Sequence, residues 1–231
     1  MMNNSFFVIF IFAHLVGDFV LQTDKIAKEK ASSIRGVFVH SSIVLLVQML
    51  FLSVFGINGM ISGFISGFFH FFIDFIKFYI NKKMLLKNMQ FLYFLFDQAV
   101  HIVIILFLTF ILGKDLGENY SQYIEYLKYV TSIIILAYTS TVGSKILIFD
   151  LDLIPKEKGF FMKNERIIDA VIAILIWIII NFIQGKLIVS ALIFILFFLY
   201  LALGKKLYKY YNKVYLIKYG VYIIVSLILK F

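Results

Sequence analysis

The sequence contains no cysteine and only one proline among its 231 residues. The absence of cysteine excludes disulfide bridges and zinc sites built from thiolates. Acidic residues are also scarce, because 13 Asp and Glu stand against 22 Lys and Arg, a formal net charge of +9. What the chain has in excess is hydrophobic residues, which make up 62% of it. A soluble domain is nearer half apolar, so this composition predicts helices that face lipid.

Eight apolar segments follow one another along the chain, each close to the roughly 20 residues that cross a bilayer. We therefore expect an all-α, polytopic integral membrane bundle of about eight transmembrane helices, organised as two four-helix modules, 1–112 and 113–231. No basic region and cleavage site mark the N-terminus, so the first segment is expected to be retained rather than removed as a signal peptide. The segments lie near residues 4–21, 36–56, 59–80, 91–112, 124–148, 166–183, 187–203 and 213–230.

The basic residues are distributed unevenly between the connections. Sixteen of the 22 lie in segments 22–35, 81–90, 149–166 and 204–219. Connections with many Lys and Arg residues alternate with connections that have few, and loops rich in these residues stay cytoplasmic. The pattern predicts a multi-pass protein of the cell membrane with both termini outside. Nucleic-acid binding is not needed to explain the positive charge, whereas anionic lipid head groups are expected near these lysines.

Histidine and aspartate recur at four-residue spacing inside the first four apolar segments. "FAHLVGDFVLQTDK" places His14 before Asp18, and "FFHFFIDFIK" and "FDQAVH" repeat the spacing. Residues four apart lie on one helix face, about 6 Å apart along the axis. Because the fourth segment runs in the opposite direction and reverses the order, we expect the aspartates in one layer nearer the cytoplasm, where the site opens. The seven residues are His14, Asp18, His40, His70, Asp74, Asp97 and His101.

A single His–Asp pair in a membrane helix is often only structural, but three pairs at matched depth favour a site. An aspartate at mid-membrane costs roughly 2.5–3.5 kcal/mol on insertion scales, and such residues usually face an interior site. Only Lys77 is expected to lie close enough to neutralise the aspartates, so the cluster requires another cation. Nitrogen and carboxylate ligands suit zinc, and also manganese or iron, and seven of them suit a centre of two divalent ions. A proton relay or a structural network is the alternative.

Polar residues outside this set have lesser expected roles. Three of them border the set and are expected to support the ligands or bind substrate, namely Gln22, Lys77 and Gln98. The second half of the chain has no histidine. Four charged residues lie near the ends of the segments 124–148 and 166–183, namely Lys145, Glu165, Arg166 and Asp169. They are most simply interpreted as a salt-bridged helix terminus.

The string "AHLVGDFVLQTDKIAKEK", a following histidine, "HFFIDFIK" and "DQAVH" together resemble a bacterial membrane family, domain of unknown function 3307 (DUF3307). The second half is similar to it more loosely, through "VGSKILI" and "NERIID". The family name implies no activity. More distantly, the His/Asp pattern resembles predicted metal-dependent hydrolases of bacterial inner membranes, which implies that the same seven residues bind metal.

The leading hypothesis is therefore a membrane metal-dependent hydrolase that acts on a lipid or another amphiphile from the cytoplasmic leaflet. Metal ions would activate a water molecule, and Asp18 or Asp97 would be the catalytic base. The sequence has no G-x-S-x-G motif, which argues against a serine esterase. A proton- or cation-coupled transporter with the same His/Asp layer is the alternative, and broken helices would favour it. A non-catalytic protein with a structural metal is a third hypothesis.

Overall fold

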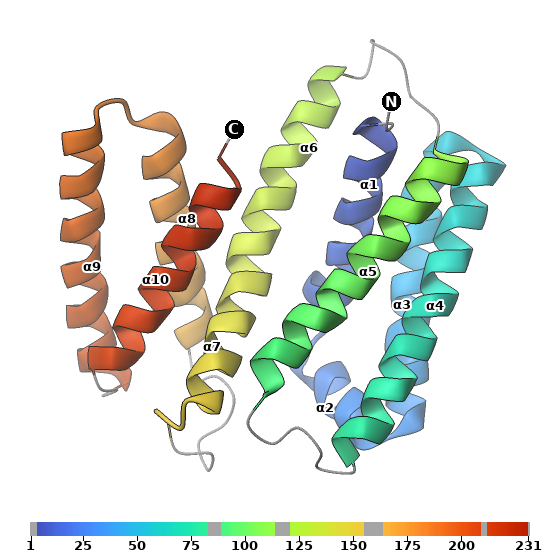
Figure 1. Cartoon of the computed structure of the whole chain (residues 1–231), viewed down its shortest axis with the longest axis horizontal. Helices are drawn as coiled ribbons and strands as arrows, with labels where there is room; N and C mark the ends of the chain where they lie inside the picture. The colour runs from blue at the N-terminus through green and yellow to red at the C-terminus, as the bar shows by residue number, and fades with distance from the viewer. Residues whose placement is uncertain (1–3, 83–88, 114–120, 155–163, 209–211, 231) are drawn as a thin grey trace. The chain divides into compact units, whose positions relative to one another are not determined.

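All regular elements in the described part of the protein are helices. The computed structural model describes residues 4–82, 89–113, 121–154, 164–208 and 212–230 (Figure 1). The predicted all-α class is confirmed, and every predicted apolar segment lies on a helix. The elements are α1 (Asn4–Leu15), η1 (Val16–Val20), α2 (Asp24–Ser32), α3 (Ile34–Leu52), η2 (Ser53–Phe55), α4 (Ile57–Lys82), α5 (Gln90–Leu112), α6 (Ser121–Ile134), η4 (Ile135–Ser140), α7 (Thr141–Asp150), α8 (Glu165–Phe182), α9 (Lys186–Tyr208) and α10 (Asn212–Ile228).

The first apolar segment is followed by a sharp break. Helix α1 continues into the π-helical turn η1, and the chain then bends by 83° into α2. Thr23 caps the start of α2, where its hydroxyl accepts a hydrogen bond of 3.3 Å from the backbone N–H three residues later. Ser33 caps α3 in the same way at 3.0 Å. Threonine and serine are favoured at this position because they satisfy an otherwise unpaired N–H. The prediction of a plain loop over 22–35 missed α2.

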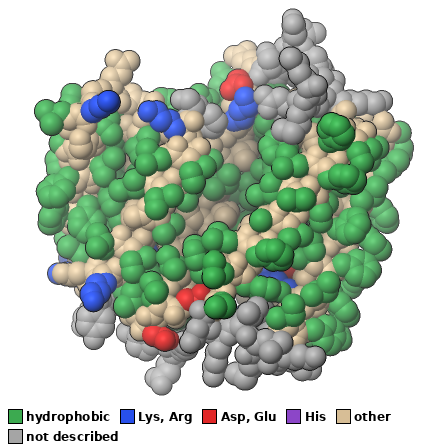
Figure 2. Space-filling view, in the orientation of Figure 1, with side chains coloured by type: hydrophobic (Ala, Val, Ile, Leu, Met, Phe, Trp, Pro, Cys, Tyr) green, Lys and Arg blue, Asp and Glu red, His purple; other side chains and the backbone are tan. Residues whose placement is uncertain are grey.

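The structure supports a membrane protein but not the predicted number of spans. Among the described residues, five helical segments are long and apolar enough to cross a membrane, or six if α1 and α2 count as one broken span. Helix α8 carries three charges in its first five residues, and α10 is only 17 residues long with two lysines. The count of about eight is therefore not confirmed. Hydrophobic side chains cover most of the face in Figure 2. The positions of the termini stay a prediction, because much of the basic connections lies outside the described residues.

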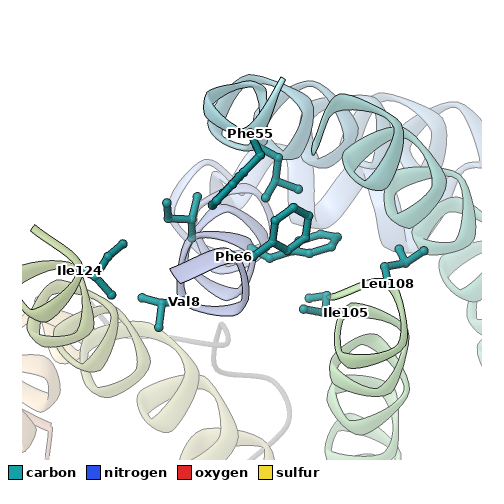
Figure 3. Packing of buried hydrophobic residues seen from close by; sticks show 9 residues of the cluster. Phe6, Val8, Phe55, Ile105, Leu108 and Ile124 are labelled. Atoms are coloured by element: carbon teal, nitrogen blue, oxygen red, sulfur yellow. The ribbon is translucent and has the colours of Figure 1, made fainter. Parts of the chain in front are cut away.

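The contacts within the chain divide it into two compact units. Unit 1 comprises residues 1–87 and 92–131, and unit 2 comprises 88–91 and 132–231. The predicted division after residue 112 stays a prediction, since a grouping of contacts does not test which parts fold separately. In unit 1 the start of α1 packs in an apolar cluster with residues of η2, α5 and α6 (Figure 3). The Phe6 ring centroid lies 4.6 Å from that of Phe55. His14 follows Phe10 by about one helical turn, and Asp18, in η1, follows it by about two.

Helices α3 and α4 approach closely because α4 presents glycines at the contact. A Cβ atom at Gly63 would lie 2.7 Å from the backbone N of Met49, and one at Gly67 would lie 2.5 Å from the Cβ of Leu45. Neither position has room for a side chain. This small-xxx-small spacing lets two helix backbones come together. The approach brings the polar residues of α3 and α4 within reach of one another.

Gly63→Ala is expected to lower the free energy of unfolding by about 1–3 kcal/mol, because the added methyl group overpacks the contact with α3. Gly220→Ala is the matched control, since a Cβ there meets no atom within 4 Å. In an open helical position alanine is more favourable than glycine by about 1 kcal/mol, so the control should be neutral or stabilising. Thermal unfolding in detergent, followed by far-UV circular dichroism, measures both. Equal midpoints for the two variants would contradict the close approach.

Candidate metal centre

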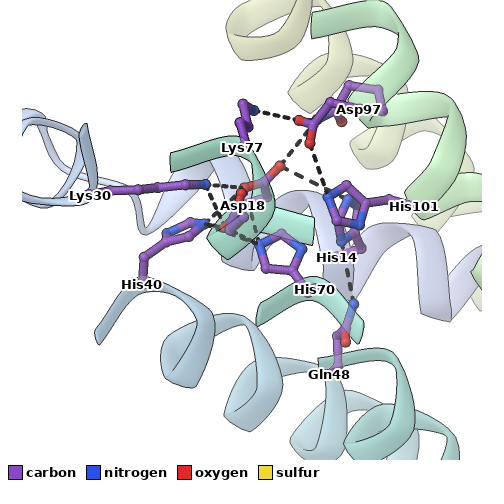
Figure 4. Close-up of polar contacts among 11 residues, drawn as sticks. His14, Asp18, Lys30, His40, Gln48, His70, Lys77, Asp97 and His101 are labelled. Carbon is purple, nitrogen blue, oxygen red and sulfur yellow. Dashed lines mark hydrogen bonds and ion pairs between the residues drawn. The ribbon is translucent and has the colours of Figure 1, made fainter. Parts of the chain in front are cut away.

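The structure brings all seven predicted residues together in one buried cluster of unit 1 (Figure 4). We call these residues the His/Asp cluster, and none of them is more than 6% exposed. They come from four helical segments, α1 with η1, α3, α4 and α5. In three of them a histidine Nε2 lies near the aspartate four residues away, at 4.0 Å for His14–Asp18, 3.1 Å for His70–Asp74 and 3.6 Å for His101–Asp97, while α3 contributes His40 alone. The predicted placement of each His–Asp pair on one helix face is thus confirmed, while the role of these residues as metal ligands stays a prediction.

Asp18 lies at the centre of the cluster, in the π-helical turn η1. Such turns are rare and occur often at functional sites. Its neighbour Gly17 lets this turn pack against α3, because a Cβ atom there would lie 2.9 Å from the Cα of Val44. Asp18 Oδ1 consequently accepts a hydrogen bond of 3.0 Å from Nε2 of His40.

Ligand atoms of Asp18, His40 and His70 lie within 4.8 Å of one another, the spacing of metal ligands, and a carboxylate oxygen of Asp74 lies near the two histidines. We call these four atoms the first donor set: Asp18 Oδ1, His40 Nε2, His70 Nε2 and Asp74 Oδ2. The two histidine nitrogens lie 3.2 Å apart, and Asp18 Oδ1 lies 3.0 Å and 3.8 Å from them. Asp74 Oδ2 lies 3.6 Å and 3.1 Å from the same nitrogens. Tetrahedral zinc with bonds of about 2.0–2.1 Å keeps neighbouring ligand atoms about 3.3–3.4 Å apart. The distances that join the two histidine nitrogens to each other and to the two carboxylate oxygens, 3.0–3.8 Å, are close to this spacing.

A second donor set lies beside the first and contains buried atoms that lack hydrogen bonds. Among the described residues, His14 Nε2, His101 Nε2 and Asp97 Oδ1 have no hydrogen-bond partner. Ligand atoms of His14, His70 and His101 lie within 4.8 Å of one another. The other carboxylate oxygen of Asp18, Oδ2, lies 4.0 Å from His14 Nε2. A buried polar atom without a partner is costly, so these atoms are suited to a ligand.

Two glutamine side chains support the donor sets. Gln48 of α3 is fully buried, and its Nε2 lies 3.3 Å from His14 Nδ1. In this orientation the amide donates to Nδ1; with the amide flipped, its oxygen would accept from Nδ1–H, which would free the lone pair of Nε2 as in a metal-binding histidine. Gln98 Nε2 donates to Asp18 Oδ2 and to Asp97 Oδ2, both at 3.3 Å. The predicted contact of Gln98 with the set is thus present, whereas Gln48 was not predicted.

Among the described residues, two lysines rather than one pair with the aspartates of the cluster. Lys77 pairs with Asp97 at 2.7 Å, as expected. Lys30 of α2 lies 2.7 Å from Asp74 Oδ2 and 3.9 Å from Asp18 Oδ1, so the expectation that only Lys77 is near enough was wrong. The error follows from the missed helix, because α2 carries Lys30 back over the cluster. With neutral histidines, three carboxylates and two ammonium groups still leave one negative charge.

Gln22 does not extend the face that carries His14 and Asp18. The helical turns end at Val20, and Gln22 lies in the bend before α2. Among the described residues, its side chain makes no hydrogen bond to the His/Asp cluster. Gln22 was predicted from its four-residue spacing after Asp18, but this spacing places residues on one face only within a helix, and the helix ends before Gln22.

Unit 2 contains a buried ionic network of its own. Lys145 of α7 donates to both oxygens of Glu165, at 2.7 and 2.9 Å. Lys218 of α10 donates to Glu165 Oε1 and to Asp169 Oδ2, both at 2.6 Å, and the hydroxyl of Tyr200 donates to Asp169 Oδ1 at 2.6 Å. These five side chains are at most 1% exposed. Of the predicted group, Lys145, Glu165 and Asp169 form salt bridges, which are buried between four helices instead of lying at an exposed helix end, whereas the Arg166 guanidinium lies 4.5 Å from the ring centroid of Tyr138.

Comparison with known proteins identifies the family of the chain. Residues 6–131 match the family described as "Protein of unknown function (DUF3307)". The matched segment includes the whole His/Asp cluster and ends where unit 1 ends. No curated protein and no solved structure matches the chain, so the more distant resemblance to metal-dependent hydrolases gains no support from a relative. The looser similarity of the second half also falls outside the match. The chain belongs to the DUF3307 family.

Proposed function

We propose that the protein is an integral membrane, metal-dependent hydrolase with two divalent ions in the His/Asp cluster. One observation carries the proposal. Ligand atoms of Asp18, His40 and His70 lie within 4.8 Å of one another, and Asp74 Oδ2 lies near the two histidines. Beside them are three buried atoms without hydrogen-bond partners among the described residues, His14 Nε2, His101 Nε2 and Asp97 Oδ1. Imidazole and carboxylate ligands without sulfur favour zinc, and also suit manganese or iron.

Asp18 is the natural bridge between the two ions. Its Oδ1 belongs to the first donor set, and its Oδ2 faces His14 in the second. His70 lies within reach of both sets. A neutral imidazole donates one lone pair, so His70 serves one ion only. The first set then has two histidines and two carboxylates, and the second has His14, His101, Asp97 and the shared Asp18. Two-metal hydrolytic centres have ions about 3.5–4 Å apart, which one carboxylate can span.

When bound, the ions would supply Lewis acidity and lower the pKa of a coordinated water to about 7. Asp97 is the better candidate for general base, because Asp18 is committed to its histidine partners. The oxygen of Asp97 outside the second donor set, Oδ2, accepts hydrogen bonds from Lys77 and Gln98, which hold it in place. Apolar helices surround the cluster, so an amphiphile whose chain remains in the bilayer is a suitable substrate.

Elemental analysis of the detergent-purified protein tests the metal centre. We expect about two equivalents of zinc, manganese or iron in the wild-type protein. Asp74→Asn affects only the first donor set, and His101→Ala affects only the second, so each should lose about one equivalent. Glu125→Gln on α6 is the control, since this glutamate pairs with Lys128 outside the cluster. Metal at background level in the reconstituted wild-type protein would refute the proposal.

Hydrolysis is tested separately with lipid esters, amides and phosphoesters in mixed micelles. We expect metal-dependent product formation in which one oxygen atom comes from ¹⁸O-labelled water. Asp97→Asn should reduce the turnover strongly, because it removes both the proposed base and a ligand of the second donor set, while the protein remains folded with the first ion bound. A metal-loaded protein that releases no product from any of these classes would contradict the hydrolase assignment and leave the metal centre standing.

A transporter is the second candidate, because one observation favours it. The chain breaks by 83° between η1 and α2, beside Asp18, and broken helices are typical of ion sites in transporters. A transporter would produce proton or metal flux in proteoliposomes that is lost in Asp18→Asn. Flux without product formation would favour this candidate over hydrolysis.

A further inference from the structure

Two lysines lie between the buried donor atoms and the surface. Lys30 Nζ contacts Asp74 Oδ2 and Lys77 Nζ contacts Asp97 Oδ2, each at 2.7 Å. The lysine side chains are 15% and 23% exposed, whereas those two carboxylate side chains are 1% and 6% exposed. Figure 4 shows both ammonium groups on the carboxylate side of the cluster. A ligand that reaches the cluster from this side meets the lysines first.

Metal ions and lysines compete for the same carboxylates. Asp74 Oδ2 belongs to the first donor set and is also the partner of Lys30. Asp97 offers Oδ1 to the second donor set and holds Lys77 through Oδ2. A divalent ion neutralises a carboxylate that previously needed the ammonium group. Binding of metal therefore leaves both lysines without their counter-charge. Helix α2, which carries Lys30, has no buried residue.

The charge of the loaded site indicates what it accepts. Three aspartates contribute −3, two divalent ions +4 and two lysines +2, a sum of +3 with neutral histidines. An attacking hydroxide ion compensates one charge, and a phosphate monoester dianion compensates the other two. A neutral ester or amide would leave two positive charges uncompensated in a site shielded from water, which is strongly unfavourable.

We infer, on the basis of the proposed metal centre, that the substrate is a phosphate monoester of an amphiphile and that Lys30 and Lys77 bind its phosphate. Lysine binds phosphate well as a point charge with three donors. In the hydrolysis the water oxygen forms a bond to phosphorus and the ester P–O bond breaks. The leaving alcohol receives a proton from the water, and inorganic phosphate is released.

Binding of inorganic phosphate to the full chain in nanodiscs tests the inference, with and without metal. We expect phosphate to bind the metal-loaded wild type and not the metal-free protein. Lys30→Met and Lys77→Met should each weaken phosphate binding about tenfold or more, because each removes a charged hydrogen bond. The same variants should bind metal as tightly as the wild type or more tightly, since a competing cation is gone. Lys28→Met, an exposed lysine on the same helix, should change neither affinity.

The opposite signs of the two effects separate this role from a structural one. A lysine that only stabilises the fold would weaken metal and phosphate binding together when it is removed. Metal binding in all variants with phosphate affinity unchanged in both lysine variants would overturn the inference alone. Absence of metal in the wild type would refute the proposed function, and the inference with it.

Competition for the bound phosphate distinguishes a lipid from a soluble source. We expect short-chain phosphatidic acid to compete at lower concentration than glycerol 3-phosphate, because its acyl chains add contacts with the apolar helices. Equal competition would overturn the amphiphilic part of the inference. Dimethyl phosphate, which carries a single negative charge, should compete more weakly than inorganic phosphate. Equal competition by this diester would overturn the assignment of a monoester.

Discussion

Asp18→Asn is expected to remove both metal ions from the protein. Asp18 is the one residue whose two oxygens face both donor sets, so its loss affects the two sites together. The asparagine has nearly the same size, but its neutral side chain offers one oxygen in place of two. Loss of a residue that merely orients a ligand costs about 10–100-fold in metal affinity, so loss of a bridging ligand should cost at least about 100-fold. Elemental analysis and titration with zinc measure the effect, and turnover should fall to background.

Asp24→Asn provides the matched control, because it makes the same chemical change six residues along the chain at an exposed position. This variant should keep both equivalents of metal. If Asp18→Asn also kept two equivalents, the bridging role would be wrong. If it lost one, Asp18 would belong to a single donor set.

Lys218→Met is expected to lower the free energy of unfolding by about 3–5 kcal/mol, the cost of breaking a buried ion pair from one side. Lys218 is fully buried and donates to Glu165 and Asp169, both at 2.6 Å. Among the described residues, the network pairs two lysines with two carboxylates, so the variant removes one of the positive charges that face Glu165 and Asp169 in the interior of unit 2. Thermal or detergent-induced unfolding followed by circular dichroism measures the loss.

The double variant Lys218→Met with Asp169→Asn restores the balance of charge, and asparagine can still accept the hydrogen bond of Tyr200. It should recover most of the lost stability, since a buried ion pair replaced as a whole is often neutral in stability. Lys213→Met, an exposed lysine on the same helix, should stay within about 0.5 kcal/mol of the wild type. A double variant as unstable as Lys218→Met would mean that packing, not charge, explains the loss.

Much of the fold could be predicted because its signals are local. Each apolar segment in the sequence became a helix, since hydrophobicity over about 20 residues and the helical rise do not depend on distant contacts. The exception is the start of the chain, where the capping residues Thr23 and Ser33 marked a short polar helix that was read as a loop. The count of spans depends on more than helix formation, because the charges of α8 and α10 reduce their apolar length.

The histidines and aspartates of the site could also be predicted from local sequence spacing, but some of the residues that contact them could not. Three His–Asp pairs could be recognised because residues four apart share a helix face whatever surrounds them. Gln48 was missed although a signal was present, since it is an isolated polar residue in the apolar run of α3. Lys218 was missed in the same way, inside the apolar segment 213–230, whereas Lys30 gave no such signal because a lysine in a polar connection is usually solvated.

The sequence by itself determined a helical, lipid-compatible chain of the DUF3307 family with His14, Asp18, His40, His70, Asp74, Asp97 and His101 on the inner faces of four segments. Only the tertiary structure decided which of these atoms meet, which stay without hydrogen bonds, and which lysines approach them. The physical reason is that helical spacing is set within one turn of backbone. The reach of a lysine, the bend after η1 and the glycine contacts of α4 depend on how separate helices pack.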